Sequence, residues 1–450
     1  MNRRPRTTLV CTALGAPALL AAGALAQFQG IAGPVSVEHE AFGRYVATVP
    51  DIDGDGVGDV AVGTDDPWPG LDSQRVFLYS GRTGAFLRSI ISVGTIAPFP
   101  HFQPQHFSVA GLAGLKDVNG DGRGDIAVAD AENRRVLVFS GATGERLHLI
   151  TLPAGEPERA FGTSVGAIDD LDGDGRGDFI VGAPIAALTF LDNGAAYIFS
   201  GATGAVLRTI VSPPIGAPII NGDPHFGSLV TGTPDLDGDS LPDALIAGAY
   251  RVSLISGTTG NILRDFKSFP NAAGFGRAIA WCPDADGDSI ADVIIGAPLS
   301  ALDATPPVRG QVAECGRAYL YSGATGALLR SWKGPTVAGN RFGWSVAGAP
   351  DLTGDGRGDV IIGAPINPDA FRGTGYGPGR VYVYSGATGA AVKVLNSPNA
   401  ELGGAFGIAV TGLPDTNTNG RADIFIGAPH EDPGSANPFA DRGRGYFLRF

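Results

Sequence analysis

An acidic nine-residue segment recurs seven times along the chain, and it constrains the fold more than any other feature. The copies read DIDGDGVGD from Asp51, DVNGDGRGD from Asp117, DLDGDGRGD from Asp170, DLDGDSLPD from Asp235, DADGDSIAD from Asp284, DLTGDGRGD from Asp351 and DTNTNGRAD from Asp415. Each copy occupies the same place in a longer repeated unit. Because neighbouring repeats share one continuous core, the 450 residues are expected to form a single repeat architecture.

Each repeated unit is predicted to contain four short β-strands. In the third unit, short apolar runs alternate with glycine-rich turns, a pattern typical of strands. The strands are predicted at 163–168, 178–182, 196–199 and 205–210, with the acidic segment between the first two. A Ser-Gly-Ala-Thr-Gly turn at 200–204 joins the last two strands. No segment shows a helical period of useful length, so an all-β fold is expected.

Two further motifs frame the acidic segment. Phe-Gly pairs precede it at Phe42, Phe161, Phe226, Phe275, Phe342 and Phe406, and Gly-Ala-Pro follows it at Gly182, Gly296, Gly363 and Gly427. This arrangement resembles the FG-GAP repeat of integrin alpha subunits, over nearly the whole chain after its N-terminus. The resemblance implies a seven-bladed β-propeller in which the acidic segments are loops between strands one and two of the blades.

Four units depart from this pattern or are incomplete. The second unit has Phe107-Ser108 and one extra residue before its acidic segment, which predicts a bulge or a shifted strand. The first, second and fourth units lack Gly-Ala-Pro. The seventh unit ends after its third strand, and residues 31–37 are expected to supply the missing outer strand, so that no edge is left unpaired.

The N-terminus reads as a secretory signal peptide. Arg3, Arg4 and Arg6 precede the apolar stretch 9–25, and Ala24-Leu25-Ala26 fits a cleavage site. The expected domains are therefore a signal peptide at 1–26 and a propeller at 27–450. No later apolar run approaches a membrane span. The mature chain is expected to be secreted, or to lie at the cell surface or in the periplasm, without a membrane anchor.

The acidic segments fit calcium, which takes six to eight oxygen ligands. We number the loops 1 to 7 and their positions one to nine. Carboxylates at positions one, three, five and nine and the carbonyl of position seven can surround one ion. Of the 45 acidic residues, 24 are aspartates at these positions. An EF-hand is excluded because it needs Glu at position twelve, which in loop 1 is Val62.

The predicted calcium ligands, loop by loop, are Asp51, Asp53, Asp55, Val57 and Asp59; Asp117, Asn119, Asp121, Arg123 and Asp125; Asp170, Asp172, Asp174, Arg176 and Asp178; Asp235, Asp237, Asp239, Leu241 and Asp243; Asp284, Asp286, Asp288, Ile290 and Asp292; Asp351, Thr353, Asp355, Arg357 and Asp359; Asp415, Asn417, Asn419, Arg421 and Asp423. Loops 1 and 3 keep four carboxylates and the glycine at position six. Loop 7 keeps only two carboxylates and is expected to bind most weakly.

Two short motifs are interpreted as coincidences. Arg-Gly-Asp occurs at 123–125, 176–178 and 357–359, but each Asp is position nine of a loop, so an adhesive role is not expected. Gly162-Thr163-Ser164-Val165-Gly166 matches a hydrolase pattern that requires a strand-to-helix turn, whereas Ser164 falls in a predicted strand. Cys282 and Cys315 are left open as a possible disulfide pair.

Two functional classes remain open. The first is a non-enzymatic recognition or adhesion-type module for an extracellular protein or glycan. The resemblance implies ligand contact on the face opposite the acidic loops, at the connections 65–75, 299–317, 367–380, 430–444, 92–106 and 212–225. The alternative is a secreted hydrolase-type enzyme that uses that face or the central opening, although no catalytic residue is predicted. The net charge of −13 and the lack of a basic patch disfavour nucleic acid.

Overall fold

The computed structural model describes residues 27–34, 40–65, 75–90, 109–156, 160–184, 194–212, 225–248, 251–267, 272–300, 315–335, 339–366, 377–432 and 441–450. Within these ranges the chain forms 28 β-strands in seven four-stranded antiparallel sheets, and no helix. In this part of the chain there is accordingly no helix long and apolar enough to cross a membrane.

The strands follow one another blade by blade. Blade 1 contains β2 (Tyr45–Val49), β3 (Asp59–Gly63), β4 (Val76–Tyr79) and β5 (Phe86–Ile90); blade 2 contains β6 (Val109–Leu115), β7 (Asp125–Asp130), β8 (Arg135–Ser140) and β9 (Arg146–Thr151); blade 3 contains β10 (Ser164–Ile168), β11 (Asp178–Ala183), β12 (Ala195–Phe199) and β13 (Val206–Val211); blade 4 contains β14 (Val230–Thr233), β15 (Asp243–Gly248), β16 (Arg251–Ile255) and β17 (Ile262–Lys267). Blade 5 contains β18 (Ala278–Cys282), β19 (Asp292–Ala297), β20 (Arg317–Tyr321) and β21 (Leu328–Lys333); blade 6 contains β22 (Ser345–Ala349), β23 (Asp359–Ala364), β24 (Arg380–Ser385) and β25 (Ala391–Asn396); blade 7 contains β26 (Val410–Leu413), β27 (Asp423–Ala428), β28 (Arg444–Arg449) and β1 (Gln27–Ile31).

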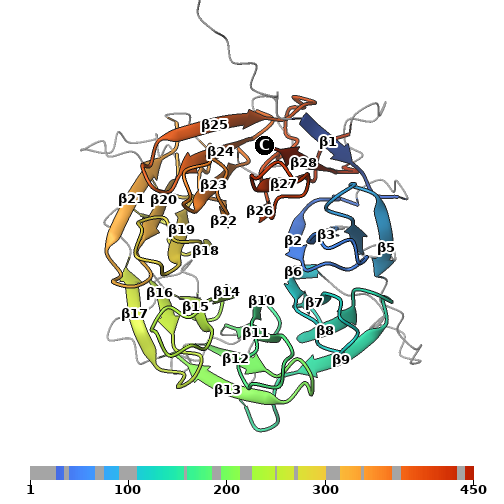
Figure 1. Ribbon diagram of the computed structural model, residues 1–450, viewed down its shortest axis with the longest axis vertical. Coiled ribbons are helices and arrows are strands. Elements are labelled where there is room, and N and C mark those ends of the chain that lie inside the picture. The colour runs from blue at the N-terminus through green and yellow to red at the C-terminus, as the bar shows by residue number, and fades with distance from the viewer. Residues whose placement is uncertain are drawn as a thin grey trace, which may run out of the picture.

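The seven sheets form a closed ring around a central opening (Figure 1). The first strand of each blade lies innermost, and the fourth strand forms the rim. This confirms the predicted all-β, seven-bladed propeller. The predicted strands of the third unit agree with the observed bounds to within one residue. The extra residue of the second unit also produces the expected bulge, between Val109 and Gly111.

The ring closes through the N-terminal strand, but not at the predicted residues. Strand β1 pairs with β28 in antiparallel register and completes blade 7, so the outer strand is Gln27–Ile31. Of the predicted strand 31–37, residues 32–34 form no strand and residues 35–37 lie outside the described residues. The chain must still cross from the rim to the inner strand of blade 1, and this connection needs the residues that follow Ile31. Gln29 on β1 donates a hydrogen bond to the carbonyl of Thr83 in blade 1 at 2.9 Å.

The apolar core lies between the blades rather than within them. Seven clusters of buried side chains each join two adjacent sheets, one at every seam. The Phe-Gly phenylalanines belong to this core. Phe161, for example, is fully buried and contacts the rings of Tyr197 and Phe199 on β12, with centroids 5.9 and 6.0 Å apart. Aromatic residues of the third strand therefore pack in the core between blades 2 and 3.

Glycines explain why the Phe-Gly and Gly-Ala-Pro motifs occur together. Gly227 of blade 4 has a φ of 88°, and its carbonyl oxygen lies 2.0 Å from where a Cβ on Gly182 of blade 3 would stand. The same approach joins Gly296 to Gly343, and Gly363 to Gly407. A side chain at either position would separate neighbouring blades, so the two motifs are the two sides of one close seam contact.

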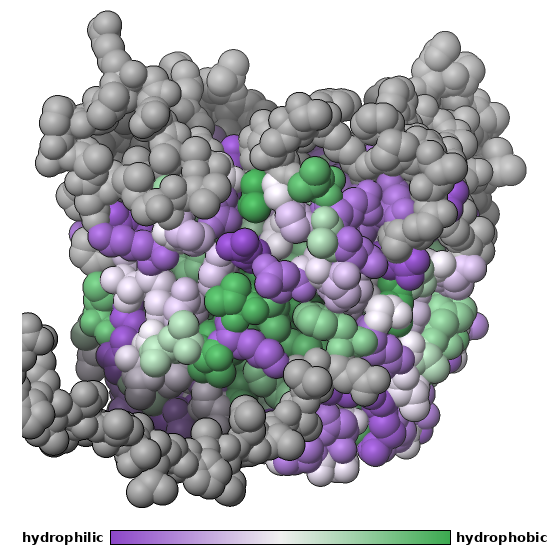
Figure 2. All heavy atoms as spheres, turned by 90° about the horizontal axis from the view of Figure 1, so that it is seen from above, coloured by the Kyte–Doolittle hydropathy of each residue, from purple (hydrophilic) through white to green (hydrophobic). Residues whose placement is uncertain are grey.

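A second set of contacts links the blades at the rim. His148 Nε2 on β9 lies 2.8 Å from the carbonyl oxygen of Gly201 in the next blade, and Arg208 Nε on β13 donates to the carbonyl of Thr258 at 3.1 Å. The rest of the rim is mixed in polarity, with Val392 and Val394 of β25 exposed. Figure 2 shows the ring from the side on which β25 lies, where apolar side chains gather among polar ones.

Cys282 and Cys315 are both buried, and the possible disulfide between them is not formed. Cys282 ends β18 beside loop 5, whereas Cys315 precedes β20 at the opposite end of the same blade. The two residues therefore lie at opposite ends of the blade.

Candidate metal centre

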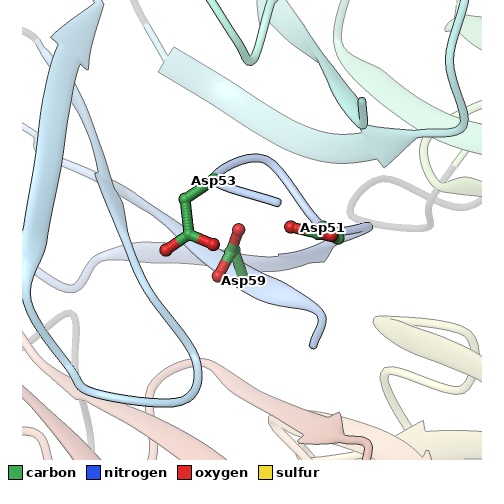
Figure 3. A group of neighbouring side chains, drawn as sticks. All are labelled: Asp51, Asp53 and Asp59. Carbon is green, nitrogen blue, oxygen red and sulfur yellow. The ribbon is translucent and has the colours of Figure 1, made fainter. Parts of the chain in front are cut away.

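The acidic loops connect the first and second strands of all seven blades, as predicted. In loop 1 the carboxylates of Asp51, Asp53 and Asp59 face one another (Figure 3). Asp51 and Asp53 lie in the loop itself, and Asp59 is the first residue of β3. One oxygen from each of the three carboxylates lies within 4.8 Å of the others. Three carboxylate oxygens at this spacing can contact one cation.

Hydrogen bonds inside the loop hold these carboxylates in place. Asp51 accepts the backbone N–H groups of Gly54 at 2.5 Å and Gly56 at 2.9 Å. Asp53 accepts the N–H of Asp55 at 3.1 Å, and Asp55 accepts that of Val57 at 2.8 Å. Gly54 and Gly56 have φ values of 91° and 82°, in the left-handed region that glycine adopts without strain. The backbone therefore positions the carboxylates, whose oxygens each keep further acceptor capacity.

The aspartate at position nine is a buried link between two turns. Asp59 is fully buried, and its Oδ2 accepts the N–H of Ile52 at 2.7 Å while Oδ1 accepts that of Gly81 at 2.9 Å. Burial raises the pKa of Asp59 to about 6, against these two hydrogen bonds that lower it, and the carboxylates of Asp53 and Asp55 raise it further. Burial likewise raises the pKa of Asp125, Asp178, Asp243, Asp292 and Asp359 to about 6.

Three other loops also gather three carboxylates, at positions one, three and nine in loop 3 and at positions one, three and five in loops 4 and 5. The groups are Asp170, Asp172 and Asp178 in loop 3; Asp235, Asp237 and Asp239 in loop 4; and Asp284, Asp286 and Asp288 in loop 5. The donors are all carboxylate oxygens, which suit a hard cation such as calcium, and the buried carboxylate of position nine favours a neighbouring positive charge. The residues present therefore fit a calcium ion in loops 1, 3, 4 and 5.

Loops 2, 6 and 7 each replace carboxylates with neutral side chains at Asn119, Thr353, Asn417 and Asn419. The aspartate at position one of each of these loops still accepts several backbone N–H hydrogen bonds. Burial opposes ionisation of Asp117, but the N–H groups of Gly122 and Gly120 and the guanidinium of Arg176 outweigh it, so the pKa of Asp117 is lowered. Backbone N–H groups likewise outweigh burial and lower the pKa of Asp351 and Asp415.

The aspartate at position five also accepts a hydrogen bond from the turn between strands three and four. In loop 1, Arg82 Nε donates to Asp55 Oδ2 at 3.1 Å, and Asp55 is absent from the converging group of that loop. In loop 4, Asp239 does converge with its neighbours while its Oδ2 accepts the hydroxyl of Thr258 at 2.6 Å. The predicted carbonyl ligands at position seven, such as Val57, stay a prediction.

The two motifs interpreted as coincidences have structural roles. Asp178, the last residue of the second Arg-Gly-Asp, is fully buried and accepts the N–H groups of Leu171 and Gly201. The arginines of the three Arg-Gly-Asp segments, at position seven of loops 2, 3 and 6, instead reach the first aspartate of the preceding loop, a pairing that sequence order did not reveal. Ser164 lies in β10, where its hydroxyl donates to the carbonyl of Gly227 at 3.3 Å.

Comparison with known proteins supports the same assignment of the repeats. The model of the FG-GAP repeat family matches residues 161–199 and 342–384, which contain loops 3 and 6. The chain is 30% identical over 241 residues to integrin alpha pat-2 of Caenorhabditis elegans, covering 49% of this chain and 18% of that protein. It is 38% identical over 101 residues to integrin alpha-PS2 of Drosophila melanogaster, covering 21% and 7%, and 34% identical over 147 residues to integrin alpha-5 of Xenopus laevis, covering 30% and 13%. The matched stretch thus spans less than a fifth of each of these relatives.

Proposed function

Because the chain is an FG-GAP repeat protein that resembles the integrin alpha propeller, we propose that it is an exported calcium-binding propeller. It acts as a non-enzymatic recognition or adhesion-type module for an extracellular protein or glycan. The observation that carries the calcium assignment is the convergence of three carboxylates within 4.8 Å in four separate loops. The proposal includes the domain division, with a signal peptide at 1–26 and the propeller at 27–450.

Calcium in these loops stabilises the folded ring. Each loop joins the inner strand of a blade to its second strand, and position nine also bonds the turn before the outer strand. An ion held by positions one, three and nine in loops 1 and 3, or by positions one, three and five in loops 4 and 5, neutralises carboxylates that repel one another without it. Because the ion binds the folded loop, each site contributes about 1.4 kcal/mol when free calcium is tenfold above the dissociation constant.

The calcium assignment is tested by equilibrium dialysis of metal-stripped protein against calcium, together with thermal melts. We expect several bound ions per chain and a melting temperature that is many degrees higher in calcium than in chelator. Asp172→Asn with Asp174→Asn removes two exposed charges from loop 3 and should lose one bound ion. Asp169→Asn changes an acidic residue just outside that loop and serves as the control. An unchanged melt in excess chelator would remove calcium from the proposal.

Recognition is assigned to the face opposite the acidic loops. The connections between strands two and three, and from strand four to the next blade, run on that face because all sheets are antiparallel. Most residues of the segments predicted to bind ligand lie outside the described residues, so the face is proposed from the topology and the resemblance. Residues such as Thr64 and Asp65 at the end of β3 mark its edge.

The recognition role is tested with the mature chain on arrays of glycans and of purified extracellular proteins, with and without calcium. We expect a saturable ligand whose binding is lost when residues 301–314, within the connection 299–317, are replaced by a short glycine-serine linker, while the calcium-dependent melt is kept. Saturable binding that survives replacement of each of the six connections would place recognition elsewhere on the ring. Catalytic turnover of an arrayed substrate would contradict the non-enzymatic assignment.

A further inference from the structure

Three arginines at position seven cross a blade seam to the first aspartate of the preceding loop. Arg123 of loop 2 contacts Asp51 of loop 1, with Nη1 and Oδ2 3.3 Å apart. The matching distances are 2.9 Å between Arg176 and Asp117, and 2.7 Å between Arg357 and Asp284. In each case the arginine is one blade further along the ring than the aspartate. The same contact therefore recurs at the seams between blades 1 and 2, 2 and 3, and 5 and 6.

Each of these guanidinium groups also covers the glycine at position four of the loop it contacts. A Cβ on Gly54 would lie 2.1 Å from a guanidinium nitrogen of Arg123, and one on Gly120 would lie 2.4 Å from that of Arg176. At Gly173 and Gly238, in loops 3 and 4, the corresponding space is open to 4 Å. The next blades carry Leu241 and Ile290 at position seven there. The loops thus fall into a covered class and an open class.

The covered aspartates use one oxygen for two partners. Asp117 Oδ2 accepts the N–H of Gly122 at 2.8 Å and the guanidinium of Arg176 at 2.9 Å. Position one is a calcium ligand in the function proposed above. A guanidinium at this distance repels a divalent cation in the same loop and occupies acceptor capacity that the cation would use. Without a cation, the same charge offsets repulsion among the carboxylates and joins two blades.

We propose that Arg123, Arg176 and Arg357 are inter-blade latches that hold their seams in the cation-free protein and weaken cation binding in the loops they cover. This inference deepens the proposed calcium function and rests on it for its second half. It also ranks loops that the sequence alone made equal. Loops 1 and 3 have identical ligand sets, but Arg123 covers loop 1 while loop 3 is open, so loop 3 binds calcium more tightly.

The experiment compares Arg176→Gln with the parent protein in metal-free buffer and across a series of free calcium concentrations. Removing the latch should lower the melting temperature of the metal-free protein. It should also raise the affinity of loop 2 for calcium by about fivefold, from loss of a nearby positive charge. At limiting free calcium, the variant should bind more calcium in equilibrium dialysis and show a larger calcium-dependent rise in melting temperature. A purely structural arginine would change the metal-free melt alone.

Arg251→Gln is the matched control, because Arg251 pairs with Asp265 at 3.5 Å within blade 4, at the start of β16 and away from the loops. It should shift both melts equally. Leu241→Arg is the reverse design, since it places a guanidinium next to open loop 3, and it should reduce the calcium-dependent rise.

Two results would overturn the inference. The latch fails if Arg176→Gln leaves the metal-free melt unchanged. The proposal that the arginine weakens cation binding fails if calcium binding is unchanged or weaker in that variant while the parent binds calcium. If calcium does not bind the parent protein at all, the proposed metal function and the proposed weakening of cation binding both fail. The metal-free melt of Arg176→Gln then still tests whether the arginine stabilises the seam.

Discussion

The carboxylate of Asp59 accepts a hydrogen bond from the backbone N–H of Gly81 at 2.9 Å, and so ties the acidic loop to the turn between strands three and four. Its second oxygen accepts the N–H of Ile52 inside the loop at 2.7 Å. The same pair of bonds recurs in six blades, with Gly141, Gly201, Gly257, Gly323 and Gly386 as the further turn partners. In blade 7, which has no such turn, the N–H of Phe450 takes that place.

Asp178→Ala should destabilise the metal-free protein by about 2–4 kcal/mol, because two buried N–H groups, of Leu171 and Gly201, lose their acceptor. Asp172→Ala in the same loop removes an exposed carboxylate and should cost less than about 1 kcal/mol. Urea unfolding in chelator measures both variants. Equal costs would show that position nine acts only through the metal.

The metal-free protein should become more stable as the pH falls from 7 toward 5. Burial raises the pKa of Asp59 from 3.8 to about 6 in the folded state, and five further position-nine aspartates behave alike. A raised folded-state pKa stabilises the fold fully below about pH 3.8, and this contribution is lost as the pH rises through about 6. Bound calcium requires ionised carboxylates, so calcium-loaded protein should show the opposite trend. Melts at pH 5, 6 and 7, with and without calcium, test both signs.

Phe28→Ala should weaken the closure of the ring by about 1–3 kcal/mol, because half-buried Phe28 on β1 contacts the rings of Phe406 and Tyr446. Gln29→Ala removes only the exposed hydrogen bond to Thr83 and should cost about 0.5 kcal/mol. Thermal melts and size-exclusion chromatography follow the two variants. If β1 contributes to closure, Phe28→Ala also increases self-association through the exposed edge of β28.

Ser240→Gly should stabilise blade 4 by about 0.5–1 kcal/mol, because Ser240 holds a φ of 73° that glycine adopts without strain. The reverse change at the same position of loop 3, Gly175→Ser, should cost a similar amount, since Gly175 has a φ of 83°. Both are measured by chemical unfolding in chelator. A loss of stability in Ser240→Gly would mean that its side chain makes a favourable contact.

Local patterns predicted much of the fold. Alternating apolar runs between glycine-rich turns predicted the strands of the third unit, and the extra residue before loop 2 predicted the bulge at Val109. These features depend on a few neighbouring residues, since strand period and turn conformation are set over short distances. The outer strand of blade 7 was placed a few residues late because its limit depends on the crossing to blade 1.

Some features of the candidate site were likewise predicted from the sequence, and others appear only in the structure. The sequence identified the carboxylates of all seven loops, because their spacing of two residues is itself the signature of the site. It did not predict that Asp59 bonds Gly81, or that Arg176 reaches Asp117 in the preceding blade. Both relationships join residues that are far apart in the chain and become neighbours only when the sheets pair and the ring closes.

What the sequence determined by itself is the repeat, the strand order within a blade and the positions of the acidic residues in the candidate cation sites, because each is encoded within one unit. What only the tertiary structure decided is which loops an arginine covers, which carboxylates are buried and where the ring closes. These depend on contacts across seams. A seam brings together residues of two units that are far apart in the chain, so the local sequence of one unit does not specify its contacts with the other.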